Sequence, residues 1–149
     1  MIIIDLIRNN HGEIYAKLSY NQRKNYLQMK WIGACSEDEL KAASMQMFKW
    51  QRSNGAGLKC KTHIHDTKEM EGAWASAELV KWISTYFFSI NYEFGLRCNI
   101  SIVSPDLFSK LTSQELQKSD SKVPTMLFET LSQAENWLGC SKEEVRHRI

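Results

Sequence analysis

The sequence predicts an α/β fold: a mixed, mostly parallel sheet begun by an N-terminal hairpin, with about four packing helices. Three observations support this fold class. Two stretches of alternating apolar residues lie close together near the N-terminus, short strand-like stretches then alternate with helical ones, and helix-start signals precede the helical stretches. Strands separated by helices usually pair in parallel, because the chain crosses over the sheet between them.

The predicted hairpin covers residues 13–32. Its first strand, residues 13–20, places three apolar side chains on one face, since side chains alternate along a strand: Ile14, Ala16 and Leu18. A polar turn over residues 21–25 leads to a second strand over residues 26–32.

The first helix has clear start and stop signals. Ser36 and Glu39 form a capping box, in which the hydroxyl and the carboxylate bind the first unpaired amides of the helix. The small and polar residues 53–57, which include two glycines, predict its end.

The later elements alternate in the same way, giving the order β-β-α-β-α-β-α-β-α in a single domain over residues 1–149. They are a strand over Leu58–Asp66, a helix over Ala73–Ser89, a strand over Arg97–Val103, a helix starting at Ser104-Pro105, a strand over Thr125–Glu129 and a helix from Thr130 to Gly139.

Composition favours a cytoplasmic globular protein. A net charge of +2 is too small to indicate a nucleic-acid partner, and the charge-free stretch over residues 82–92 is too short to span a membrane. Asp5 and Arg8 interrupt the apolar start before a signal-peptide core is complete. The four cysteines are far apart in sequence, as is typical of free thiols in a reducing compartment. Among them Cys35, just ahead of the first helix, is the first choice for a nucleophile.

Several short patterns together resemble the STAS-like superfamily, which has the anti-sigma-factor-antagonist fold and is related to CRAL-TRIO-like domains. The matching features are a strand ending in Trp31-Ile32-Gly33 before the first helix, a strand ending in Asp66 before the second, and Phe128-Glu129-Thr130 leading to Trp137-Leu138. The resemblance covers residues 12–139 and implies a divergent bacterial member. It also implies a non-enzymatic regulatory module that binds a protein partner, a nucleotide or a lipid.

Asp66 and Thr67 are the first candidates for a regulatory site. The resemblance places them where phosphorylated members carry an Asp-Ser-Ser/Thr-Gly motif, but Lys68-Glu69 replaces the second hydroxyl and the glycine. The negative charge of Glu69 and Glu71 already present would reduce the effect of a phosphate on Thr67. Asp66 then either faces a ligand or accepts hydrogen bonds from the amides of the following turn.

His63 and His65 support an alternative hypothesis, a metal-dependent hydrolase. Two histidines two residues apart lie on the same face of a strand, and Asp66 follows them directly. A third converging ligand would complete a site that activates water. The competing interpretation is that both rings are buried and hydrogen-bonded as part of the scaffold, so we assign no metal ligand.

Trp74 and Trp82 complete the binding candidates. Trp74 follows the predicted strand end, and Trp82 belongs to a helix with more apolar residues than one buried stripe needs. The surplus predicts a ligand-lined groove or a dimer contact, so a structural homodimer is a third hypothesis. No glycine-rich phosphate loop is present, and we expect no cofactor. The main expectation is a non-enzymatic module that binds a protein partner or a small apolar ligand.

Overall fold

The computed structural model of the protein describes residues 1–71, 76–103, 107–119 and 121–147, with the side chains of residues 107–111 and 140–147 left out. It confirms the α/β fold class. Six strands form one mixed sheet in the order β1-β2-β3-β4-β5-β6, in which the first three strands pair antiparallel and the rest pair in parallel. The strands are β1 (Ile2–Arg8), β2 (Ile14–Asn21), β3 (Tyr26–Gly33), β4 (Thr62–Met70), β5 (Cys98–Ile102) and β6 (Thr125–Phe128).

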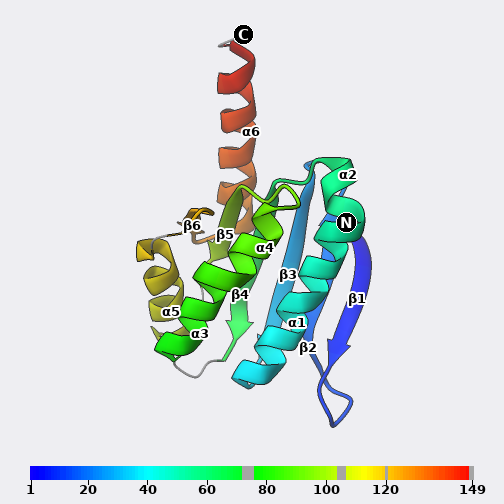
Figure 1. The fold of residues 1–149 in the computed structure, drawn as a ribbon, viewed down its shortest axis with the longest axis vertical. Helices are drawn as coiled ribbons and strands as arrows, with labels where there is room; N and C mark the ends of the chain where they lie inside the picture. Colours follow the sequence, from blue (N-terminus) through cyan, green and yellow to red (C-terminus); the bar gives the residue numbers. More distant parts are fainter. Residues whose placement is uncertain (72–75, 104–106, 120, 148–149) are drawn as a thin grey trace.

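Helices cover both faces of this sheet (Figure 1). The helical segments, with π-helical turns labelled η, are α1 (Glu37–Trp50), η1 (Gln51–Gly55), α2 (Ala56–Leu58), α3 (Ala77–Lys81), η2 (Trp82–Phe87), α4 (Phe88–Tyr92), α5 (Leu107–Lys118) and α6 (Leu131–His147). Helices α1 to α5 lie on one face, and α6 lies on the other and extends beyond the sheet.

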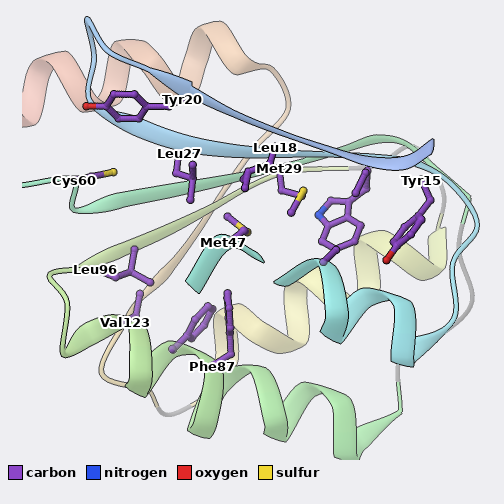
Figure 2. Packing of buried hydrophobic residues seen from close by; sticks show 14 residues of the cluster. Tyr15, Leu18, Tyr20, Leu27, Met29, Met47, Cys60, Phe87, Leu96 and Val123 are labelled. Atoms are coloured by element: carbon purple, nitrogen blue, oxygen red, sulfur yellow. The ribbon is translucent and has the colours of Figure 1, made fainter. Parts of the chain in front are cut away.

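Two apolar clusters correspond to these two faces. The larger cluster joins β2 and β3 to α1 and α4; Figure 2 shows Leu27 and Met29 of β3 pointing toward Met47 and Phe87 of the helices. The smaller cluster packs α6 against the opposite face through residues such as Ile64. Strands buried on both faces cannot show the apolar-polar alternation of a half-exposed strand.

The predicted hairpin is confirmed, but strand β1 was missed. Because β1 lies at the sheet edge, nearly all its side chains are exposed, and no alternating pattern marks it. Two register irregularities, at Ile3/Asp5 and at Ile7/Arg8, also interrupt its pairing with β2.

The predicted end of the first helix within residues 53–57 was wrong. The chain stays helical through Gly55 and Gly57 to Leu58, and it ends at Lys59, whose φ of +56° reverses the chain. The capping box of Ser36 and Glu39 is confirmed.

The predicted strand over Leu58–Asp66 also has different bounds, because β4 begins later and continues to Met70. The next helix begins after Ser76, whose hydroxyl accepts a hydrogen bond from the Leu79 amide. The predicted helix start at Ser104-Pro105 falls outside the described residues. The last helix runs past Gly139 to His147.

Candidate functional site

Two rows of side chains, most of them polar, cross the sheet on the face covered by α1 to α5. The strand register places one residue from each of β3 to β6 side by side in each row. The rows are Leu27, His63, Asn99 and Thr125, then Met29, His65, Ser101 and Leu127. Strands that are covered by helices on both faces usually carry apolar side chains. The buried polar side chains in these rows are therefore unusual.

Gln51 reaches into the first row from the π-helical turn of the long first helix. Its Nε2 donates to the carbonyl oxygens of Cys60 and Phe94, both at 2.8 Å, and its Oε1 lies 2.9 Å from His63 Nε2. Two carbonyl partners require the amide nitrogen at that position, so the oxygen faces His63. π-helical turns are frequent at functional sites, and here one aims a fully buried amide at the sheet.

The contact with Gln51 determines which ring nitrogen of His63 carries the proton. Since Gln51 Oε1 accepts, His63 Nε2 carries the proton and donates, and Nδ1 is left as an acceptor. That Nδ1 is buried and has no hydrogen-bond donor among the described residues. Burial, and next the neighbouring His65, lower the pKa of His63 to about 3, so the ring is neutral at pH 7.

Trp31 fixes the protonation of His65 in the same way. Its indole Nε1–H can only donate, and it lies 3.1 Å from His65 Nδ1. Nδ1 therefore accepts, and the neutral ring carries its proton on Nε2. Burial lowers the pKa of His65 to about 4. The ring is only partly buried, and it lines a partly open space between the sheet and the helices.

That space is a cavity of about 90 Å³. Its strand side is mainly polar and includes His65, Thr67 and Ser101; its helix side is mainly apolar and includes Leu40, Phe87 and Leu116. No Asp, Glu, Lys or Arg lines it among the residues that the structure describes. An apolar pocket with a few converging polar groups is typical of a small-molecule site.

The cavity lies toward the carboxyl ends of the parallel strands, where α/β sheets commonly bind ligands. A β-bulge helps to shape it. Lys30 pairs with Asp66 and Ile32 with Glu69, so β4 contains one residue more than β3 between these pairs. The bulge includes Thr67, which lines the cavity and donates a hydrogen bond to the Ile102 carbonyl at 2.5 Å.

Asp66 and Thr67 lie within β4, whereas the sequence indicated that the strand ends at Asp66. Asp66 lies on the α6 face, where its Oδ1 accepts a hydrogen bond from the Lys68 amide at 3.1 Å. Thr67 is buried, and its hydroxyl already donates to the Ile102 carbonyl. A kinase would therefore have to open the strand to reach Thr67.

Of the two tryptophan candidates, only Trp82 belongs to the described residues, and it is not among those that line this cavity. Trp74 lies outside the described residues. The Trp82 ring stacks on Phe87, with centroids 5.7 Å apart, and the Lys41 ammonium lies 5.5 Å from the Trp82 ring centroid. Trp82 is thus a packing residue at the edge of the larger apolar cluster.

The structure brings His63 and His65 onto one face, as predicted, but Asp66 lies on the other. Within the described ranges, no group of three or more His, Cys, Asp or Glu side chains could hold a metal ion. The thiols give no better candidate for chemistry: burial raises the pKa of Cys35, Cys60 and Cys98 to about 11, which leaves them protonated and weakly nucleophilic at pH 7.

The sequence interpretation missed Gln51, Asn99 and Ser101. A signal was present for the strand residues, because Asn99 and Ser101 alternate with Ile100 and Ile102 in a strand expected to be buried on both faces. No comparable signal identified Gln51, since its role depends on contacts with distant residues.

Comparison with protein-family models, with curated proteins and with solved structures finds no match to this chain. Within the described residues, no helix combines the length and the apolar character needed to cross a membrane.

Proposed function

We propose that this protein is a non-catalytic binding module, STAS-like as the sequence resemblance implies, that binds a small, largely apolar ligand between its sheet and its helices. The cavity of about 90 Å³ carries this proposal. The sequence left two binding classes open, a protein partner or a small ligand. A small, concave, partly open cavity with a mainly apolar helix side favours the ligand.

The cavity volume limits the size of the ligand. An engineered apolar cavity of about 150 Å³ in another protein binds benzene, so the smaller, partly open space here suits a ligand smaller than benzene, with at most about five heavy atoms. Such a ligand would contact the sheet and helices α1, α4 and α5 at once. Its occupancy would thereby stabilise their mutual packing.

The lining favours binding over catalysis. His65 is the titratable side chain among the described lining residues, and with a pKa of about 4 it is a weak base at pH 7. The described residues contain no set of three metal ligands, so they do not support the metal-dependent hydrolase. The homodimer through Trp82 remains a prediction, and the Trp82 contact with Phe87 does not favour it.

Nuclear magnetic resonance with a small apolar probe tests the proposal. We expect 2-methyl-1-butene to produce saturable amide shifts centred on the lining residues Ser101, Ile83 and Phe88, with a Kd of about 1 mM. Ser44→Leu fills the cavity from α1 and should abolish these shifts, because Ser44 is 2% exposed and lines the cavity.

Ala42→Leu is the matched control, since it adds the same side chain at an exposed position of the same helix. This variant should bind the probe as the wild type does. Shifts that persist in Ser44→Leu, or that centre away from the cavity in the wild type, would contradict the proposal.

A further inference from the structure

The geometry points to an uncharged ligand that carries one oxygen acceptor, held by a hydrogen bond from His65 Nε2–H, with the rest of its body apolar. This inference rests on the proposed function, because it names the chemical class of the ligand in the same cavity. It separates carbonyl-, ether- or alcohol-containing molecules from pure hydrocarbons and from carboxylates.

The donor follows from the Trp31 contact. An indole N–H has no acceptor capacity, so its 3.1 Å contact makes His65 Nδ1 an acceptor and places the ring proton on Nε2. His65 lines the cavity, and Trp31 supplies the hydrogen bond that it makes within the described part of the chain. Its Nε2–H is not among the fully buried unpaired atoms, so we infer that it can donate to a ligand that reaches the ring.

The absence of charged groups from the described lining decides the ligand's charge. A carboxylate transferred into this partly open space would lose part of its hydration without gaining a cationic partner among the described lining residues, which is unfavourable. Burial also favours the neutral form of His65, so the ring does not supply a positive charge at pH 7. An uncharged oxygen acceptor avoids this penalty and still satisfies the donor.

The two walls of the cavity set the shape of the ligand. The polar group belongs on the strand side, where His65, Ser101 and Thr67 lie. The hydrocarbon part belongs against Leu40, Phe87 and Leu116 on the helix side. A ligand that is apolar at one end and carries an oxygen at the other matches both walls.

Three probes of nearly equal shape test this inference: 2-butanone, its hydrocarbon isostere 2-methyl-1-butene and its anionic isostere propionate. Each is titrated at pH 7 into the wild type and into His65→Phe, which keeps a ring but removes the donor. We expect His65→Phe to weaken 2-butanone about tenfold and to leave 2-methyl-1-butene within about twofold, the difference expected for one hydrogen bond. Propionate should give no saturable shift in either protein.

A measurement on the wild type alone covers the case in which His65→Phe does not fold. The ¹⁵N resonance of His65 Nε2 should move on addition of 2-butanone and stay in place on addition of 2-methyl-1-butene.

If both probes bind but His65→Phe weakens them equally, or the Nε2 resonance does not respond to 2-butanone, the inference is wrong while the proposed function stands. Propionate that binds as tightly as 2-butanone also overturns the inference. If neither uncharged probe binds, the proposed function fails and the inference fails with it.

Discussion

Gln51 shows how one buried side chain organises this protein. Its amide joins the first helix to the Cys60 and Phe94 carbonyls and to His63, so four segments meet at one residue. The glycine one turn later makes this possible. A Cβ added at Gly55 would lie 2.6 to 2.8 Å from atoms of the Gln51 amide, which is closer than side chains tolerate. The two residues are therefore coupled, although neither belongs to a recognisable motif.

Substitution of the two helical glycines tests this coupling. Gly55→Ala should lower the free energy of unfolding by about 3 kcal/mol, because the new methyl group displaces Gln51 and breaks buried hydrogen bonds. Gly57→Ala is the control: a Cβ added there would meet no atom within 4 Å, and alanine is the better helix former, so stability should rise by about 0.5 kcal/mol. Urea denaturation of both variants measures the difference. Equal effects at the two positions would contradict the coupling.

The difference between these glycines also shows what the sequence could not reveal. Both looked like helix-stopping residues, and the prediction of a helix end within residues 53–57 followed from that. Gly55 is instead required by a tertiary contact inside a continuing helix. The tendency of glycine to end a helix was outweighed at Gly55 by the hydrogen bonds of Gln51, which join residues up to 43 positions apart.

At the scale of elements, the sequence predicted the strands of the interior and missed the exposed edge strand. The hairpin of β2 and β3 followed from alternation. Strand β1 escaped because Ile2, Ile3 and Ile4 are all more than a third exposed, so its sequence shows no buried stripe. In the cavity-lining strands, His65 and Thr67 of β4 were named as candidates from the sequence, but Asn99 and Ser101 of β5 were not.

Strand β1 provides a direct test of this description. Ile3 is 56% exposed, whereas Ile7 packs against the larger apolar cluster. Ile3→Ala should therefore change the free energy of unfolding by less than about 0.5 kcal/mol, and Ile7→Ala should cost about 1.5 kcal/mol. Chemical denaturation at low protein concentration makes the comparison. A cost at Ile3 equal to that at Ile7 would show that a second molecule or another segment of the chain covers the edge strand. Sedimentation would then distinguish a dimer from a monomer.

At the scale of the whole molecule, the order of the elements after β1 followed from the sequence, and the cavity did not. Alternating strands and helices, with capping signals, were enough for the α/β class and for helices on the sheet. The cavity depends on how side chains from β3, β4, β5 and four helical segments fit together, and this fit produces no periodic pattern in the sequence. The two histidines illustrate the division: their shared face was predictable, but their partners, Gln51 and Trp31, were not.

Burial of the two histidines makes the stability of the whole molecule depend on pH in a defined window. The folded-state pKa values of His63 and His65, about 3 and about 4, lie below the usual value of 6.5, which the unfolded chain should show. Below pH 6.5 the unfolded state therefore binds more protons than the folded state, so stability falls as the pH falls. Between pH 6.5 and 5, each histidine should contribute a loss of about 1.5 kcal/mol, before most carboxylates titrate.

His65→Asn separates the contribution of His65, because its side-chain oxygen can still accept the Trp31 hydrogen bond but the residue does not titrate. We expect urea denaturation to show a loss of about 3 kcal/mol between pH 6.5 and 5 for the wild type and about half that loss for the variant. The comparison is made as a change with pH within each protein, so a constant cost of the substitution cancels. An identical pH dependence in the two proteins would mean that the pKa of His65 is the same in the folded and unfolded states, and below pH 6.5 the cavity would then present a cation to its ligand.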